Sequence, residues 1–167
     1  MLDHKNIKIK LNTDFSEIDS TKYDRIFYTG SIDEFFNYEF GQLPYRSVNF
    51  KFETYDKEYY QSNSVINYPC NYDFTRIHEY KYYLDDKSGK TVIAKEYSEI
   101  FELGKNERYY PIPKDENAQL YSLYLEKAKV LKNVHFLGRL GDYKYYDIDK
   151  AILRALELFE QIKNERN

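Results

Sequence analysis

The alternation of apolar and polar residues between Tyr45 and Tyr97 limits the fold of this chain more than any other feature of the sequence. Its first segment places apolar and polar side chains on opposite faces of an extended chain, namely Val48, Phe50 and Phe52 against Ser47, Asn49, Lys51 and Glu53. This two-residue period is typical of a half-buried antiparallel strand. Residues 64–68, 74–84 and 91–97 continue the pattern. The sequence therefore predicts an antiparallel sheet of about four to six strands.

Turn-forming residues separate these segments. Pro69 follows one of them, and residues 85–89 (DDKSG) lie between two others. Such clusters mark turns because Asp, Ser and Gly adopt turn conformations readily. We therefore predict a hairpin at residues 85–89.

Shorter strands are predicted before the sheet. Residues 7–11 (IKIKL) alternate apolar and basic side chains, and residues 25–29 (RIFYT) form a second apolar run that ends at Gly30. Ser31 then precedes two acidic residues, a pattern typical of the N-cap and first turn of a helix. A strand, a glycine and a helix start can bind a nucleotide, although a single glycine at such a place is more often only a turn.

Two helices are predicted in the second half of the chain. Asp115 is a suitable N-cap for a helix over residues 116–131, and a final helix is predicted over residues 148–162. The apolar residues expected to be buried by the final helix are Ile148, Ile152, Ala155, Leu156, Phe159 and Ile162. Together, the elements predict a mixed α and β (α+β) fold.

Residues 134–149 (VHFLGRLGDYKYYDID) combine several groups suited to phosphate. An apolar strand stops at Gly138 and Arg139, and two tyrosines with Asp147 follow where the last helix begins. Glycine, a guanidinium and a helix start can bind an anion together. The alternative is structural: Arg139 would pair with an acid, the tyrosines would pack in the core, and Asp147 would be the N-cap of the helix.

Arg76 is the second candidate anion ligand. In residues 74–83 (FTRIHEYKYY) it shares one predicted strand face with aromatic side chains and His78. A guanidinium on such a face is either paired structurally or available to an anion. His78 is two residues away and could act as a general acid or base, but an isolated histidine is more often structural.

Composition excludes some classes of function. The 167 residues carry a net charge of −3, which favours neither a general nucleic-acid binder nor a membrane-surface protein. The single Cys70 excludes an internal disulfide, and the three histidines show no metal-ligand spacing, so no metal site is expected. No run of about 20 apolar residues predicts a membrane span. We therefore expect a cytoplasmic protein.

Several motifs of the sequence resemble, in order, those of UDP-galactopyranose mutases. They are residues 28–50 (YTGSIDEFFNYEFGQLPYRSVNF), 62–68 (SNSVINY), 74–83, 108–113 (RYYPIP) and 138–149 (GRLGDYKYYDID). The resemblance extends from about Ile7 onward and is to the carboxyl-terminal part of that family only. It implies the interconversion of UDP-galactopyranose and UDP-galactofuranose, in which the N5 atom of reduced FAD forms an adduct with the sugar while UDP departs.

The resemblance also implies two sets of site residues. Those near the substrate UDP-galactose are Arg76, Tyr110, Tyr145, Asp147 and Asn67. Those near the FAD cofactor are Thr29, Gly30, Arg46, Gly138, Arg139 and Tyr146. In domain terms, residues 1–44 and 132–167 would belong to a three-layer FAD-binding fold, and residues 45–131 to an antiparallel substrate-binding sheet with one helix.

One departure from the family pattern is large. The six glycines include no GxGxxG arrangement, which is the phosphate-binding loop of dinucleotide-binding folds. We therefore expect that this polypeptide alone does not catalyse the mutase reaction. Its expected partners are the missing amino-terminal lobe or further copies of itself. The alternatives are a non-catalytic module that binds UDP-sugars or glycans, and an inactive remnant.

Overall fold

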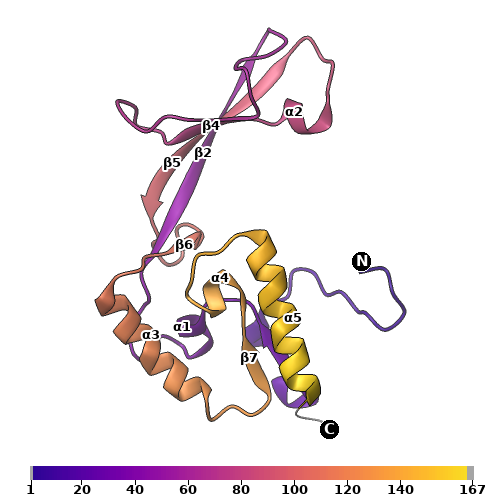
Figure 1. Ribbon diagram of the computed structural model, residues 1–167, viewed down its shortest axis with the longest axis vertical. Helices are drawn as coiled ribbons and strands as arrows, with labels where there is room; N and C mark the ends of the chain where they lie inside the picture. Colours follow the sequence, from indigo (N-terminus) through magenta and orange to yellow (C-terminus); the bar gives the residue numbers. More distant parts are fainter. Residues whose placement is uncertain (1, 165–167) are drawn as a thin grey trace.

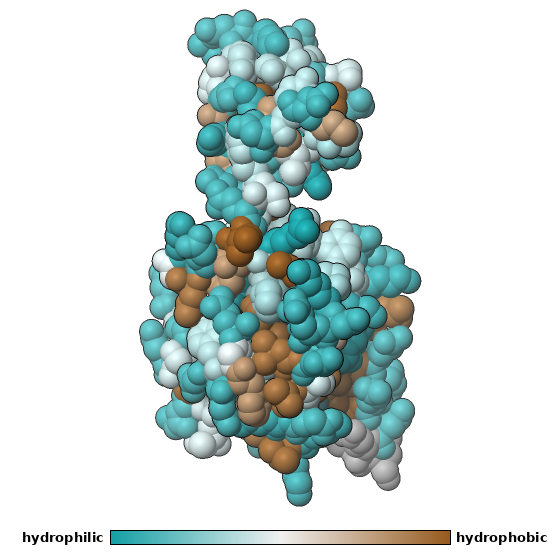
Figure 2. All heavy atoms as spheres, turned by 90° about the vertical axis from the view of Figure 1, so that its left-hand side faces the viewer, coloured by the Kyte–Doolittle hydropathy of each residue, from teal (hydrophilic) through white to brown (hydrophobic). Residues whose placement is uncertain are grey.

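A computed structural model describes residues 2–164 as two parts joined by a narrow connection (Figures 1 and 2). We call residues 46–100 the arm and residues 2–45 with 101–164 the body. The arm contains most of β2 (Tyr45–Tyr55), together with β3 (Val65–Asn67), β4 (Arg76–Glu79), α2 (Lys81–Leu84) and β5 (Thr91–Ile100). The body contains the 3-10 turns η1 (Phe15–Glu17) and η2 (Ser20–Lys22), the strands β1 (Ile26–Tyr28), β6 (Tyr110–Pro111) and β7 (Val134–Phe136), and the helices α1 (Ile32–Phe35), α3 (Asp115–Ala128), α4 (Gly138–Gly141) and α5 (Ile148–Asn164).

The alternating segments form a curled five-stranded sheet in the order β3-β4-β5-β2-β6, with every neighbouring pair antiparallel. The long strands β2 and β5 pair from Arg46 opposite Ile100 to Tyr55 opposite Thr91, and they carry the arm away from the body (Figure 1). The predicted antiparallel sheet is therefore confirmed. At the body end, β6 pairs with Tyr45 and Arg46, so this sheet connects the two parts.

The predicted strand over residues 74–84 is wrong in its second half. β4 ends at Glu79 and the chain then forms α2. The buried Lys81 accounts for this change. Its ammonium group donates hydrogen bonds to the backbone carbonyls of Glu58, Ser88 and Lys90, and these bonds hold the flanking loops against the start of α2. Residues 85–89 consequently join a helix to β5, and the predicted hairpin between two strands is not present.

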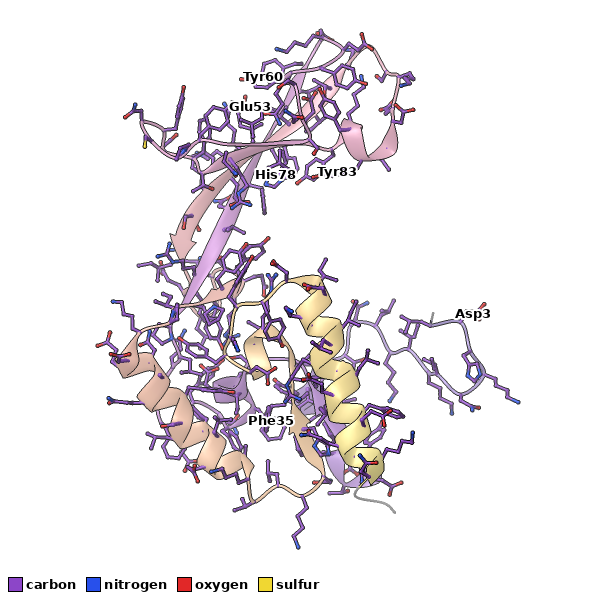
Figure 3. All side chains as sticks on the ribbon, viewed as in Figure 1. Asp3, Phe35, Glu53, Tyr60, His78 and Tyr83 are labelled. Atoms are coloured by element: carbon purple, nitrogen blue, oxygen red, sulfur yellow. The ribbon has the colours of Figure 1, made fainter. Side chains whose placement is uncertain are left out.

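The body contains a second, parallel sheet of β1 and β7, with Ile26 opposite Val134 and Tyr28 opposite Phe136. Aromatic rings cover it: the Phe35 ring centroid lies 4.9 Å from that of Phe136 and 5.1 Å from that of Tyr28 (Figure 3). The predicted strand at residues 7–11 is wrong. These residues are irregular and exposed, because no strand among residues 2–164 lies beside them to accept their hydrogen bonds.

The main core lies between α1, α3 and the start of β2. Its buried members are Ile32, Leu43, Tyr45, Phe101, Tyr124 and Tyr143. The Tyr124 hydroxyl accepts a hydrogen bond from the Phe40 backbone at 3.1 Å and donates one to the Gly41 carbonyl at 2.6 Å. Buried tyrosines need such partners, because an unpaired hydroxyl in an apolar core is costly.

Both predicted helices are present, but the N-cap of the first and the buried face of the second differ from the prediction. α3 begins at Asp115 with Lys114 as its N-cap, so Asp115 is not the cap residue. α5 spans the predicted range, but the buried face was predicted wrongly: among the six residues expected to be buried, only Ile162 is. Ile148, Ile152, Leu156 and Phe159 are 57–77% exposed.

The apolar surface of α5 is wider than the part that the body covers. At about 100° of rotation per residue, Leu158 and Ile162 lie on one flank of this surface and the exposed residues lie on the other. The body covers the first flank only. No helix within residues 2–164 is long and apolar enough to span a bilayer.

Candidate functional site

One guanidinium and two phenol rings meet where the arm joins the body. The Arg139 guanidinium lies 4.7 Å from the Tyr145 ring centroid and 5.8 Å from that of Tyr110, and the two rings are 5.2 Å apart, edge to face. Arg139 is on α4, Tyr110 on β6, and Tyr145 in the loop before α5. The structure thus brings Tyr110 to Arg139 and Tyr145, which lie about 30 residues further along the chain, and cation–π contacts join the guanidinium to both rings.

The position of Arg139 depends on the turn before it. Gly138 has φ +87°, a left-handed conformation that other residues rarely adopt, and a side chain there would meet Thr29 at 3.7 Å. The Arg139 Nε–H donates to the Tyr146 carbonyl at 2.7 Å. Within residues 2–164, neither terminal nitrogen of Arg139 makes a hydrogen bond, so both can bind an anion.

The ends of the two parallel strands meet beside this turn. The Leu137 backbone N–H donates to the Tyr28 carbonyl at 3.1 Å, which sets β7 against the end of β1. Thr29 therefore lies beside Gly138, and the Gly30 carbonyl lies near Gly141. A Cβ at Gly141 would meet the Tyr28 carbonyl at 3.2 Å, so a small residue there allows the close approach.

Arg76, the candidate ligand in the arm, is held by a carboxylate on the neighbouring strand. In the sheet, Arg76 lies opposite Glu96 on β5 and Asn67 on β3. The Arg76 Nε lies 3.1 Å from a carboxylate oxygen of Glu96. The two groups form an ion pair, but their geometry is not that of a hydrogen bond. The terminal nitrogens of Arg76 make no hydrogen bond with any residue that the structure describes. Both predicted roles of Arg76 are thus compatible: one side is paired and the other is available.

Glu96 is a site residue that the sequence analysis missed. Its buried carboxylate accepts from the Thr75 hydroxyl at 3.0 Å and lies 3.1 Å from His78 Nε2. His78 (labelled in Figure 3) also packs edge to face against Phe50, so its contacts fit the structural interpretation. The only signal in the sequence was an acidic residue on a predicted strand, and a partner could not be assigned without the register.

Burial raises the pKa of Tyr110 to about 12, with further increases from Tyr109 and Tyr145 and a smaller decrease from the positive charge of Arg76. At neutral pH the Tyr110 phenol is protonated and can donate a hydrogen bond to an oxyanion.

Among the other predicted site residues, Asp147 contacts this cluster, Arg46 is paired with one of its members, and Asn67 is joined to none of them within residues 2–164. The Tyr145 hydroxyl donates to Asp147 at 3.1 Å, while the Asp147 backbone carbonyl accepts the first hydrogen bond of α5, from Ala151. Arg46 lies opposite Tyr110 in the sheet and is exposed, as is Asn67 on β3. No contact joins either of these two residues to Arg139 among residues 2–164.

A groove of about 720 Å³ extends from the cluster along α5. Tyr145 and Tyr146 line it together with three basic and three acidic side chains, namely Lys144, Lys150, Arg154, Asp142, Asp147 and Glu157. Hydrogen bonding fixes Tyr146 at its wall, because its hydroxyl donates to Asp142 at 2.9 Å. Burial and this acidic partner raise the pKa of Tyr146 to about 12.

The fold and the cluster define a class: an α+β protein with arginine and tyrosine side chains gathered on one surface suited to a phosphorylated ligand. Comparison with known proteins identifies the family. A sequence model of the UDP-galactopyranose mutase family matches residues 1–145. The chain belongs to this family.

Individual relatives agree with that assignment. The chain is 39% identical to a probable UDP-galactopyranose mutase of Klebsiella pneumoniae, over 95% of this chain and 41% of that protein. It is 39% identical to the UDP-galactopyranose mutase of Mycoplasma genitalium, over 82% of this chain and 35% of that protein. A dTDP-fucopyranose mutase of Escherichia coli is 35% identical, over 99% of this chain and 46% of that protein. The chain spans less than half the length of these relatives.

Proposed function

We propose that this chain is the carboxyl-terminal part of a UDP-galactopyranose mutase and supplies the surface that binds the diphosphate of UDP-galactose. The observation that carries the proposal is the cluster of Arg139, Tyr110 and Tyr145, in which a guanidinium packs against two phenol rings. Guanidinium groups with unused N–H donors, next to protonated phenols, match the oxygens of a diphosphate.

These residues would act on the reaction through charge. When UDP leaves the sugar, negative charge develops on the diphosphate, and donors already in place stabilise it without rearrangement. Arg76 is fixed by Glu96, and Arg139 by the Tyr146 carbonyl, so the donors are held before the ligand binds. Asp147 and Asn67 would position the rest of the substrate from either side.

The family cofactor would be FAD, which supplies the nucleophilic nitrogen that attacks the anomeric carbon. We propose that Thr29, Gly30, Gly138, Arg139, Arg46 and Tyr146 would border it. The turn at Gly138 fits this role, because its glycine leaves the backbone beside Thr29 uncovered. These residues fit one edge of the cofactor only, and the sequence contains no glycine-rich loop for its pyrophosphate.

The domain assignment follows the same logic. Residues 1–44 and 132–167 would belong to an FAD-binding fold of which β1 and β7 form part, and residues 45–131 to the substrate-binding sheet and its helix. A parallel pair of strands is usual in larger α/β sheets with both faces covered, which favours this interpretation.

Two measurements on the purified chain test the proposal. Calorimetric titration with UDP is expected to show binding, and added FAD is expected to be lost on desalting, leaving no visible absorbance. Turnover of UDP-galactofuranose by the chain with FAD and dithionite would contradict the expectation that the chain alone is inactive. Failure to bind UDP would contradict the assignment of the cluster.

A non-catalytic UDP-sugar-binding module is the second candidate. It is favoured by the fact that the arginine and tyrosine cluster is formed by this chain, whereas the glycine-rich loop is not. Binding of UDP-galactose by a chain that remains inactive when joined with the rest of the family fold would support this candidate. Competition between UDP and dTDP would then define which nucleotide the surface prefers.

A further inference from the structure

His78 makes a polar contact that the proposed function does not use. Its Nε2 lies 3.1 Å from Oε2 of Glu96, while the other oxygen of the same carboxylate, Oε1, lies 3.1 Å from Nε of Arg76. Arg76 and His78 are two residues apart on β4, so their side chains lie on one face of the sheet. A single carboxylate therefore joins the histidine to an arginine that is proposed to bind the diphosphate.

The three side chains differ in their access to solvent. The side chains of Glu96 and His78 are 7% and 18% exposed, whereas that of Arg76 is 38% exposed. Charges interact more strongly where water is excluded, so the contact between His78 and Glu96 is a sensitive one. The cluster has a shielded end at His78 and an open end at Arg76, where an anion can approach.

Glu96 is the charged group that His78 contacts among the residues that the structure describes. The other side chains that face His78 from neighbouring strands are uncharged, namely Val65 on β3, Phe50 on β2 and Ala94 on β5. On its own strand end, the Tyr80 ring stacks on His78 with 6.1 Å between the ring centroids. Burial, with further increases from Tyr83 and Glu96, raises the pKa of Tyr80, so this phenol stays neutral at physiological pH. The charge of His78 therefore acts mainly on Glu96 and, through it, on Arg76.

Protonation of His78 changes the charge of this cluster. A carboxylate only accepts hydrogen bonds, so Nε2 carries its hydrogen toward Glu96 whether the imidazole is neutral or charged. The second proton is taken up at Nδ1, which makes no hydrogen bond within residues 2–164. The cluster then changes from neutral to positive while its contacts stay in place. Histidine side chains undergo this change between about pH 5 and 8.

We propose that His78 is a positioning residue, which acts through Glu96 to set the positive charge that Arg76 presents to a diphosphate. When His78 is neutral, Glu96 neutralises Arg76. When His78 is protonated, the carboxylate is shared between two cations, and an anion beside Arg76 meets a net positive charge. Affinity for the anion therefore rises as the pH falls, and binding takes up part of a proton. The inference rests on the proposed diphosphate site.

Calorimetric titration of the full chain with UDP-galactose over about pH 5 to 8 tests the proposal. UDP-galactose is used because both of its phosphates keep a constant charge over this range, whereas the terminal phosphate of UDP gains a proton near about pH 6. We expect affinity at least about 3-fold higher at the acidic end than at the alkaline end. Titrations in buffers of different ionisation enthalpy should show proton uptake. Constant affinity without proton uptake would overturn the proposal.

Variants assign the effect to His78. His78→Gln keeps an N–H donor for Glu96 but cannot gain a proton, and we expect it to bind at every pH as weakly as the unmodified chain does at the alkaline end. His78→Lys is charged throughout this range and should bind at every pH as tightly as the unmodified chain does at the acidic end.

His4→Gln is the matched control, because it also removes a histidine but at an exposed position in the body. The control should keep the pH dependence of the unmodified chain, and circular dichroism should show that all three variants are folded. Equal pH dependence in His78→Gln and in the control would refute the proposed role of His78.

Failure of this coupling and failure of the proposed function are distinguishable. UDP-galactose that does not bind at any pH would contradict the diphosphate site. The NMR signal of the Arg76 Nε–H group then tests the coupling without a ligand, because its chemical shift should follow the charge of His78 in the unmodified chain and not in His78→Gln. A signal that does not respond to pH in the unmodified chain would overturn the proposal.

Discussion

The body and the arm differ in the balance of apolar and polar groups that they bury. In the body, most buried side chains are aliphatic or aromatic, with Tyr45, Tyr124 and Tyr143 as the largest, and only Ser31, Asp33 and Asn117 are polar among the buried residues that the structure describes. In the arm, the buried aliphatic residues are Ile77, Ile93 and Ala94, and buried polar groups accompany them, namely Ser47, Glu79, Lys81, Thr91 and Glu96. On the face shown in Figure 2, brown apolar patches gather mainly on the body.

The difference shows how a narrow sheet can present a fixed guanidinium. The arm is too thin for a large apolar core, so hydrogen bonds and ion pairs fix its loops and strands. One of these groups, Glu96, also holds Arg76 and His78. In the arm, therefore, the buried polar groups that stabilise the fold also position the candidate ligand-binding residue.

The largest effect is expected in the body core. Tyr124→Ala removes a fully buried ring and two hydrogen bonds, and we expect it to lower the free energy of unfolding by about 3–5 kcal/mol, as for other aromatic residues replaced by alanine. Urea denaturation measures this loss. Tyr83→Ala in the arm is the control, since Tyr83 is 60% exposed. Equal losses in the two variants would contradict the assignment of the core to the body.

A somewhat smaller effect is expected from the polar groups of the arm. The Glu79 carboxylate accepts hydrogen bonds from the backbones of Tyr60 and Gln61, at 2.8 and 3.0 Å, and from the Thr91 hydroxyl. Glu79→Ala leaves these donors unpaired, and we expect a cost of about 1–3 kcal/mol. Hydrogen exchange should show faster opening of the loop at residues 56–64, while the amides of α3 keep their protection. Unchanged exchange in that loop would argue against a structural role for Glu79.

A further difference between the body and the arm is expected in how stability depends on alkaline pH. Burial raises the pKa values of Tyr28, Tyr143 and Tyr146, all in the body, to about 12 from an ordinary value of 10.0. Because the folded chain holds protons that the unfolded chain releases above pH 10, this stabilisation is complete below pH 10 and is lost as the pH rises toward 12.

The free energy of unfolding should therefore fall between pH 10 and 12. Tyr28→Phe keeps the ring and removes one titrating group, so its stability should fall less over this range. Tyr72→Phe, at an exposed position in the arm, should follow the unmodified chain. The idea fails if both variants show the same dependence on pH.

The smallest effect is expected at the exposed ion pairs of the arm. Lys90 lies 2.7 Å from Asp56, but both side chains are largely in solvent. Lys90→Ala should change the free energy of unfolding by less than about 0.5 kcal/mol. A loss as large as that of Glu79→Ala, measured in the same urea titration, would mean that surface charge contributes more to the arm than its buried groups do.

The sequence predicted the strands of the arm better than it predicted which face of the final helix is buried in the body. Alternation reports which residues share a strand face, and this was enough to predict an antiparallel sheet of about four to six strands, although not its fifth strand β6. It does not report register, so the pairing of Arg76 on β4 with Glu96 on β5, the next strand along the chain, was missed. Likewise, the helical spacing of α5 showed that the helix is apolar but not which flank of its wide apolar surface meets the body.

The residues of the candidate site were predicted through family resemblance. Composition and spacing alone left a structural role for Arg139 and the tyrosines open. The structure shows that Arg139, Tyr110 and Tyr145 meet, and that Thr29 and Gly138 are neighbours. Residues 7–11 could not be predicted correctly because a strand requires a partner, and none lies beside them within residues 2–164.

The most direct test of the account is the affinity of UDP for variants of the two parts. The proposed site takes one arginine from the arm and one from the body, so Arg76→Ala and Arg139→Ala should each weaken UDP binding by about 10-fold or more in calorimetric titration, as expected for loss of a charge-assisted hydrogen bond. Lys90→Ala should bind as the unmodified chain does. UDP binding that survives either arginine substitution unchanged would contradict a site shared between arm and body.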